Sequence, residues 1–519
     1  MKTQCKSVFF ILLAAIACSS ARAQPISSNP STPPPPERSA PAVTTTAILS
    51  NEPAAVPTTP LRDEPASRST ASCKASEPVP DIHHVFLIVL ENMNYDVSLG
   101  DRAPASRLKE IAHSNKRLEY YYGIGHNSLD NYIALISGQP PNPATQMDCP
   151  VFEDFKEISS VQHNWHCSRW NKYLRSKEAE LLRGFTTSTS DRSLSHGAQL
   201  ESLRTDLGKI AGIAKGECDG EHAADSYKLA SGWGCVYPPS VTALADQFDQ
   251  NVPPVKWRAY MESMPHANKD KRPDPGRFDK TYSRENLGYA TRHNPFAYFH
   301  SLTDLKAGEV MSTFDTNDRP LDNLEQIEND LMSEKTEFPQ FVFISPNLCH
   351  DGHTKCLGIT KLQAIDRFVP DLVGAIQKSD AYRDDGVIII TFDEAEVPKG
   401  FAFLPSSDDE GDGNESKFAK ACCDERSGPM WKKPGLRGPG GGQVGAIIIS
   451  NFVKPGVYSD HEFNHYSLLR SIEDMLLTRV RSKERYLGFA SQPSLRTLQE
   501  CGVFDNPTGH SESITSSGL

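Results

Sequence analysis

A serine in the stretch Tyr120–Asn142 has the surroundings expected of a nucleophile. The sequence there is YYYGIGHNSLDNYIALISGQPPN, in which Gly125 loosens the backbone just before Ser128. We expect a helix that begins at Ser128, continues through Tyr132–Ser137 and ends at Gly138. A hydroxyl at a helix start faces free N–H groups and the positive end of the helix dipole, where a phosphate group binds favourably. A serine there can also be an ordinary N-cap, so its chemistry depends on its neighbours.

Two pairs of oxygen-bearing residues could supply those neighbours. Glu91 and Asn92 form one pair, and Asp393 and Glu394 form the other. Carboxylate and amide oxygens are the ligands that hard divalent cations prefer. A serine is a weak nucleophile unless a base or a metal lowers the cost of removing its proton. A metal ion held by these four residues would therefore activate Ser128.

Each of these pairs follows a short apolar run, which indicates how the fold could bring them together. Four such runs occur: Val85–Leu90, Phe341–Ile344, Val387–Ile390 and Ala446–Ile449. Uninterrupted runs rich in β-branched residues are typical of parallel strands covered by helices on both faces. Ligand sites in open α/β sheets lie at the carboxyl ends of the strands. Polar residues after all four runs therefore predict one shared site. The alternative is that strand ends are simply where polar residues begin.

Histidines follow two of the runs. His350 and His353 lie in SPNLCHDGH after the second run, and His461 and His465 come after the fourth. Imidazoles at a strand end can bind or protonate a phosphoryl group. With Cys349 and Cys356, the first two could instead form a structural zinc cluster, although an exported chain more often closes a disulfide. His83, His84 and His113 are expected at the surface or at a strand start.

The 519-residue chain is expected to contain one folded domain. The predicted fold class is α/β, a single large three-layer α/β/α domain with a mostly parallel sheet and sizeable insertions. The N-terminus has lysines, an apolar stretch and an A-x-A site before Gln24, which is typical of a secretory signal peptide; Cys18 offers an alternative lipoprotein cleavage point. The expected parts are a signal peptide (1–23), a disordered Pro/Ser/Thr-rich leader (24–79), the folded domain (80–504, with an insertion at about 148–234) and a disordered tail (505–519).

Charge and cysteine content narrow the function. The formal charge is −12 and becomes −15 once Lys2, Lys6 and Arg22 leave with the signal peptide. An acidic chain without a Lys/Arg cluster is not expected to bind nucleic acid, and no later stretch is apolar enough to span a membrane.

The twelve cysteines fall to ten after cleavage, an even number that indicates disulfides. Cys218 with Cys235 and Cys349 with Cys356 are the expected local pairs, and Cys422 and Cys423 should each join a different partner.

Several separated motifs resemble a known family. In order they are I-x-H-V…LEN, GHNSLDNY–LISG, SPNLCHDGH, TFDE, GG-x-V-x-A-III-S and NHYSLL-x-S-IED. Together, over roughly residues 81 to 480, they resemble the bacterial and fungal phosphoesterase family, which contains secreted acid phosphatases and phosphatidylcholine-hydrolysing phospholipases C. That family is similar in fold to the alkaline phosphatase superfamily.

The resemblance implies a role for each motif residue. Ser128 matches the nucleophile that forms a phosphoseryl intermediate, and Asn131 matches the amide that holds a phosphate oxygen. Glu91, Asn92, Asp393 and Glu394 match the metal ligands. The histidines that match groups around the phosphoryl centre are His350, His353, His126 and His293.

The ligand set differs from that of two-zinc phosphatases, which carry Asp-His where this chain has Asp393-Glu394. One divalent metal ion with mostly oxygen ligands is therefore expected, and Ca, Mg, Mn, Zn and Fe all remain open. The expected function is a secreted, metal-dependent acid phosphatase that hydrolyses phosphomonoesters through a phosphoserine intermediate. A phospholipase C-type phosphodiesterase is the alternative, and a non-catalytic secreted binding protein on the same fold is a second one.

Overall fold

The computed structural model describes Cys73 and most of the chain from Pro80 to Asp505. It leaves out residues 158–226, 265–287, 304–316, 397–417 and 429–439, together with shorter pieces. The predicted signal peptide, the leader other than Cys73, the tail after Asp505 and most of the predicted insertion at about 148–234 thus lie outside the described residues. The chain divides into two units, Met1–Glu64 and Pro65–Leu519, and only the second has described residues.

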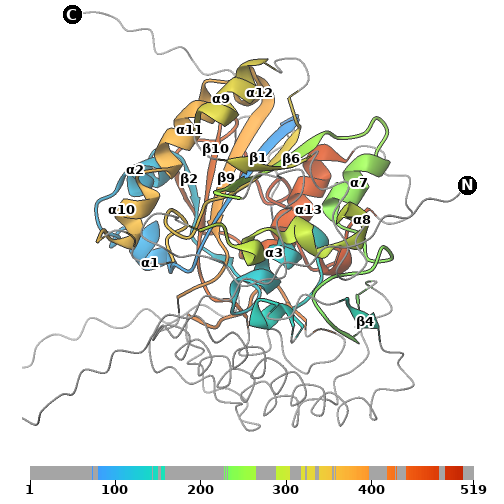
Figure 1. Cartoon of the computed structure of the whole chain (residues 1–519). Helices are drawn as coiled ribbons and strands as arrows, with labels where there is room; N and C mark the ends of the chain where they lie inside the picture. The colour runs from blue at the N-terminus through green and yellow to red at the C-terminus, as the bar shows by residue number, and fades with distance from the viewer. Residues whose placement is uncertain are drawn as a thin grey trace, which may run out of the picture. The chain divides into compact units, whose positions relative to one another are not determined.

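A mostly parallel sheet of eight strands lies at the centre of the described part (Figure 1), in the order β11-β2-β10-β9-β1-β8-β6-β7. The strands are β1 (His84–Leu90), β2 (Lys116–Leu118), β6 (Trp257–Glu262), β7 (Asp318–Leu321), β8 (Phe341–Ser345), β9 (Gly386–Phe392), β10 (Ala446–Ser450) and β11 (Gly456–Tyr458). The pairings from β9 through β1, β8 and β6 to β7 are all parallel. The predicted α/β class is confirmed.

All four apolar runs are strands of this sheet. The side chains of β1, β8, β9 and β10 are buried along almost their whole length. Burying a Val, Leu, Ile or Phe side chain contributes about 1.5–3 kcal/mol, so these strands supply much of the core. Strand β6 was not predicted, because its sequence WRAYME mixes apolar and charged residues although all six are buried.

The prediction that all four runs end at the same sheet edge was wrong for the fourth. Strand β10 pairs antiparallel with both β9 and β2. Ser450 at its end lies opposite Val387 at the start of β9, which is the other edge of the sheet. The chain leaves β9 at the carboxyl edge and enters β10 from that same edge, since Ala446 lies opposite Thr391. An apolar run alone does not reveal strand direction.

Helices lie on both sides of the sheet in Figure 1, which gives the three layers. One group contains α2 (Arg107–His113), α9 (Leu324–Ser333), α11 (Val369–Gln377) and α12 (Asp380–Asp385), with α11 against α2 and α9. The other contains α3 (Ser128–Ser137), α7 (Leu244–Gln250), α8 (His300–Thr303) and α13 (His465–Leu476), with α3 against α13 and α7. Short helices α1 (Tyr95–Ser98) and α10 (Lys361–Ile365) complete the set in the described residues.

Four disulfides are present among the described residues. Cys349–Cys356 was predicted and is confirmed, which argues against a zinc cluster built on those thiols. Cys235 pairs with Cys149 instead of Cys218, so that prediction was wrong; sequence proximity did not decide the partner. Cys422 and Cys423 bond to each other, although each was expected to join a different partner.

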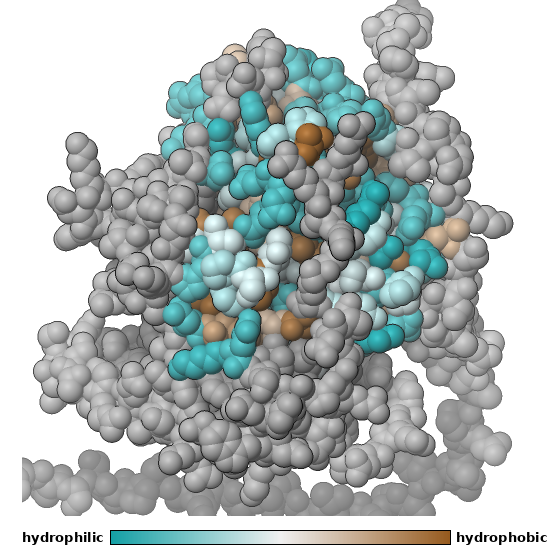
Figure 2. Space-filling view, turned by 90° about the vertical axis from the view of Figure 1, so that its right-hand side faces the viewer, coloured by the Kyte–Doolittle hydropathy of each residue, from teal (hydrophilic) through white to brown (hydrophobic). Residues whose placement is uncertain are grey.

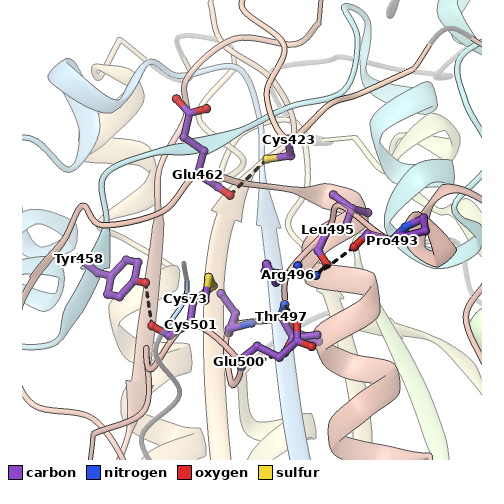
Figure 3. Close-up of a disulfide and its surroundings, with 12 residues drawn as sticks. Cys73, Cys423, Tyr458, Glu462, Pro493, Leu495, Arg496, Thr497, Glu500 and Cys501 are labelled. Carbon is purple, nitrogen blue, oxygen red and sulfur yellow. Dashed lines mark hydrogen bonds between the residues drawn. A yellow bond between two sulfur atoms is a disulfide. The ribbon is translucent and has the colours of Figure 1, made fainter. Parts of the chain in front are cut away.

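The fourth disulfide, Cys73–Cys501, joins residues 428 apart in sequence (Figure 3). Close to it, the Tyr458 hydroxyl donates a hydrogen bond to the Cys501 carbonyl oxygen at 2.7 Å. Figure 3 also shows Cys423 beside Glu462; its sulfur lies 3.3 Å from the Glu462 carbonyl oxygen. This end of the molecule is therefore cross-linked both covalently and by hydrogen bonds.

The visible described surface is mainly hydrophilic. Figure 2 shows hydrophilic residues over most of that face, with small separate hydrophobic areas between them. The exposed large hydrophobic residues of the described part are Val97, Val252, Met332 and Val457. Within the described residues, none of the helices has the length and apolar character needed to span a bilayer.

Candidate active site

The candidate site lies at the carboxyl ends of three neighbouring strands, β9, β1 and β8. The register places Leu90 opposite Phe392, so Glu91 and Asp393 follow side by side. The Asp393 N–H donates to the Leu90 carbonyl at 2.8 Å, and the Glu91 N–H donates to the Asp351 carbonyl at 2.9 Å. The three loops that follow these strands are thus held together by their backbones.

Ser128 points into this edge from the first turn of α3. Its hydroxyl donates to Glu91 Oε2 at 2.9 Å. The N-cap of α3 is Asn127, so Ser128 is not the N-cap of this helix. Tyr132, one turn further on, donates its hydroxyl to Glu91 Oε1 at 3.2 Å. Both residues are buried, and the helix therefore presents the serine to the carboxylate that was predicted to bind metal.

The loop before Ser128 is fixed by Asn131. Its amide oxygen accepts from the N–H groups of Ile124 (2.7 Å) and Gly125 (3.2 Å), and its amide nitrogen donates to the Gly125 carbonyl at 3.0 Å. The predicted role of Asn131 in holding a phosphate oxygen stays a prediction, and these contacts give it a second one, bracing the loop. Asn127 has φ +87°, a strained conformation for a residue with a side chain, immediately before the serine.

Asn92, Glu394 and His126 form the second part of the site. The Asn92 amide donates to Glu394 Oε1, while Glu394 Oε2 lies 3.4 Å from His126 Nδ1. Asp393 turns one carboxylate oxygen to the N–H of Glu394 at 2.7 Å. All four predicted metal ligands are therefore at one edge, three of them more than nine-tenths buried.

The buried carboxylates repel one another. Burial raises the pKa of Asp393 well above its usual value, and the charges of Glu91 and Glu394 add to this rise. Burial likewise raises the pKa values of Glu394 and Asp351. Glu91 is the exception: burial would raise its pKa, but the charge and hydrogen bond of His293 outweigh it and hold the pKa below the usual range. Glu91 is thus the carboxylate that remains ionised.

This donor set fits a hard metal ion. Asp393 Oδ2, Asp351 Oδ2 and Glu394 Oε2 are buried and accept no hydrogen bond within the described part. Buried oxygens of this kind are normally satisfied, and a cation satisfies several at once. The described carboxylates at this edge do not form a group of three with ligand atoms within 4.8 Å of one another; Cys73, His461 and Cys501 do, but those sulfurs are bonded together. A bound ion would therefore have to draw the carboxylates closer.

Two of the predicted histidines adjoin the serine and its carboxylate. His293 Nε2 lies 2.9 Å from Glu91 Oε1 and its Nδ1 lies 3.8 Å from Asp351 Oδ2, while its ring stacks on Tyr132 at 5.2 Å. His353 is more exposed at the same edge. Desolvation lowers the pKa of His353, and the Glu91 charge acts in the opposite direction.

His350 is placed differently from its neighbour in the motif. Its Nδ1 lies 2.7 Å from Glu262 Oε1 at the end of β6, and its ring stacks on Phe368. These contacts are with Glu262 and Phe368, and neither is a predicted metal ligand. Between the two histidines, Gly352 has φ +95°, so the backbone changes direction before His353.

The two C-terminal histidine candidates are also separated. His465 Nε2 donates to the Asp393 carbonyl at 2.6 Å, and the Tyr121 hydroxyl lies 3.0 Å from its Nδ1. Burial lowers the pKa of His465 to about 4, so the ring is neutral and holds the Asp393 loop. His461 instead lies near the Cys73–Cys501 disulfide.

Sequence reasoning missed four residues at the site: Asp351, Tyr132, Asp148 and Arg292. Asp351 lies between His350 and His353 in a motif read for its histidines, and Tyr132 was assigned only to the helix body. Asp351 lies in the loop that follows the apolar run Phe341–Ile344, between two histidines already assigned to the site, which was a readable signal. Arg292 directly precedes the predicted His293, which was a local signal, whereas nothing local marks Asp148 because it reaches the site from a distant loop.

The site and fold together define an α/β protein with a helix-start serine beside a cluster of buried carboxylates. The phosphoesterase family model matches residues 118–476, and the chain belongs to that family. Ser128, His350 and Asp393 lie inside the matched segment, and Glu91 lies before it. The predicted family is confirmed.

Named relatives are similar over part of their length. A "probable acid phosphatase" of Kluyveromyces lactis is 27% identical over 160 residues, 31% of this chain and 32% of that protein. A "phosphate-repressible acid phosphatase" of Penicillium chrysogenum is 25% identical over 214 residues, 41% of this chain and 46% of that protein. The match thus spans less than half the length of either relative.

Among solved structures, an alkaline phosphatase superfamily protein from Vibrio parahaemolyticus has a TM-score of 0.35 at 10% identity, covering 77% of this chain and 67% of that one. The protein Ps i-CgsB has a TM-score of 0.39 at 11% identity, covering 82% and 77%.

Proposed function

We propose that the protein hydrolyses phosphate monoesters, as a secreted acid phosphatase that uses Ser128 and one divalent metal ion. The observation that carries the proposal is the 2.9 Å hydrogen bond from the Ser128 hydroxyl to Glu91, at the start of a ten-residue helix and beside three carboxylates that each have one buried oxygen accepting no hydrogen bond in the described part. The names of the two fungal relatives and four disulfides support acid phosphatase activity and export.

The chain prepares Ser128 for attack on phosphorus. Glu91, kept ionised by His293, orients the hydroxyl, and the strained Asn127 holds the serine at the tip of the loop. A divalent ion held by Glu91, Asn92, Asp393 and Glu394 would lower the pKa of the hydroxyl and offset charge on the phosphoryl oxygens. The Ser128 oxygen then bonds to phosphorus as the ester oxygen leaves, which gives a phosphoserine that water hydrolyses.

His353 is the proposed acid for the leaving group. It is solvent-exposed and close enough to Glu91 for their charges to interact, so it can serve the ester oxygen that leaves a substrate bound at Ser128. Because its pKa is lowered, it is protonated only at acidic pH, and activity should fall as the pH rises above that pKa. His293 is more buried, between Glu91 and Asp351, and positions the carboxylate that orients the serine.

The test compares purified protein and Ser128→Ala on p-nitrophenyl phosphate and on bis(p-nitrophenyl) phosphate. We expect hydrolysis of the monoester, loss of at least about a thousandfold in Ser128→Ala and an acid-stable phosphoserine at Ser128 after rapid quenching. Faster turnover of the diester would favour the phospholipase C-type alternative. No turnover of either ester by metal-loaded wild type would favour a binding protein.

A further inference from the structure

Arg292 brings a permanent positive charge into the carboxylate site from a distant loop. It lies in the short helical turn Thr291–His293, next to the histidine that contacts Glu91. Its charge acts on Glu91, Asp351 and His353, which are the groups around Ser128. Lys361, the other cation whose charge reaches His353, is paired with Glu396 at 2.9 Å. Arg292, which pairs with Asp148 at 3.8 Å, is therefore a second cation close to the groups around the serine.

Asp148 links Arg292 to the nucleophile helix. Its Oδ1 accepts the N–H of Leu129, the residue after Ser128, at 3.0 Å. Its Oδ2 lies 3.8 Å from Arg292 Nε. Asp148 and Cys149 both have left-handed backbones, with φ +56° and +52°, and the Cys149–Cys235 disulfide holds the second of them. A covalently tethered turn thus fixes one carboxylate between the helix start and the guanidinium.

We propose that Arg292 binds the non-bridging oxygens of the substrate phosphoryl group, and that Asp148 is the positioning residue that holds its guanidinium beside Ser128. This inference rests on the proposed function and deepens it by naming the charge that selects the substrate. A guanidinium offers paired N–H donors whose geometry matches phosphate oxygens. Both side chains retain access to solvent, 20% for Arg292 and 31% for Asp148, so an entering anion can reach them.

The charge balance indicates which ester this arrangement favours. Glu91 is held ionised, and each of the other three buried carboxylates, Asp351, Asp393 and Glu394, adds charge that repels an anionic substrate whenever it ionises. A monoester dianion brings more negative charge than a diester and gains more from an additional fixed cation. Arg292 therefore favours monoesters, and its loss should lower monoester turnover more than diester turnover.

The first experiment measures binding without turnover. Metal-loaded, full-length Ser128→Ala protein is titrated with inorganic phosphate by calorimetry, with and without Arg292→Gln. We expect Arg292→Gln to weaken phosphate binding about tenfold or more, and Arg292→Lys to weaken it less. Arg367→Gln is the matched control, because Arg367 is an exposed arginine and the charge change is the same. Unchanged phosphate affinity in folded Arg292→Gln protein would overturn the proposal.

The second experiment measures turnover and separates the two residues. Arg292→Gln should lower kcat/KM for p-nitrophenyl phosphate about a hundredfold and shift the monoester-to-diester ratio toward the diester. Asp148→Asn should cost about tenfold alone and almost nothing in the Arg292→Gln background, because it acts through the arginine. Equal losses of Asp148→Asn in both backgrounds would contradict the positioning role. If wild type fails to hydrolyse either ester, the proposed function fails, while the phosphate titration still reports on Arg292.

Discussion

The two edges of the central sheet differ in how their charged side chains are arranged. At the carboxyl edge, Glu91, Asp351, Asp393 and Glu394 are buried together, and three of them have a raised pKa. At the amino edge, cationic groups are paired with partly exposed carboxylates: His84 Nδ1 lies 2.5 Å from Asp385, and the buried Arg258 lies 3.4 Å from Asp330.

The amino edge also has a hollow of about 540 Å³, whose lining includes Asp249, Lys256, Trp257 and Arg258. It mixes both signs of charge and holds no cluster of like charges. A fold that needed only stability would keep carboxylates apart or pair them, as this edge does. The repulsion at the carboxyl edge therefore supports the proposed site for a cation and an anionic substrate.

The first test of this difference between the two edges removes one carboxylate from each edge. Asp393→Asn should abolish the rise in melting temperature on adding divalent metal and lower activity about a thousandfold, because a charged ligand is lost. In metal-free protein the same change should raise the melting temperature, since it relieves repulsion with Glu91 and Glu394.

Asp330→Asn is the control from the amino edge. Asp330 accepts a hydrogen bond from the Tyr260 hydroxyl at 2.5 Å and faces Arg258. Its substitution should lower the melting temperature and leave the metal response and kcat intact. Calorimetric melting with and without chelator, together with elemental analysis, checks both variants. A fall in the metal-free melting temperature of Asp393→Asn would show that the carboxylates do not repel one another.

A second test uses two histidines of one motif that face different partners. His353→Ala should lower kcat about a hundredfold with little loss of stability, as expected when an acid at a wet edge is removed. His350→Ala should lose less activity and more stability, because the ring stacks on Phe368 and bonds Glu262. Melting temperature and kcat on both proteins decide this. An equal loss of activity in His350→Ala and His353→Ala would indicate that His350 also acts at the phosphoryl group.

The third test concerns pH. The folded pKa of His465 is about 4, against 6.5 for an ordinary histidine, so the unfolded chain binds the proton more readily. The stability contributed by neutral His465 is complete above about pH 6.5 and is lost as the pH falls toward 4, by up to about 3 kcal/mol. Asp393, whose pKa is raised, acts in the opposite direction.

Comparing His465→Gln with wild type isolates the histidine, since glutamine can still donate to the Asp393 carbonyl but does not titrate. The difference in unfolding free energy, from urea melts between pH 7 and 4.5, should shrink as the pH falls. A constant difference would show that His465 does not titrate on unfolding.

The smallest effect is expected at the hollow of the amino edge. Lys256→Ala removes a lining charge there and should leave kcat/KM within about twofold of wild type and the melting temperature almost unchanged. Standard phosphatase assays and thermal melts are sufficient. A tenfold change in kcat/KM would indicate that the amino edge is coupled to the site.

The sequence alone determined the strands and the helix that carry the main site residues. Three uninterrupted apolar runs predicted their strands: Val85–Leu90, Phe341–Ile344 and Val387–Ile390. Both faces of these strands are buried, and that burial can be recognised from the residues of the strand itself. Ser128 at the start of α3 and Gly138 at its end followed from the preferences of helix termini, which depend on a few neighbouring residues. The motifs that identified the family are also short stretches of sequence that can be recognised without the structure.

The contacts between groups far apart in the sequence could not be predicted and are known from the tertiary structure alone. The direction of β10, the partner of Cys235, the different partners of His350 and His353, and the approach of Asp148 and Arg292 to Ser128 all depend on how loops return to the sheet. Hydrophobic periodicity specifies which face of an element is buried. It carries no information about which long-range contact that face will make, because many pairings bury the same apolar area.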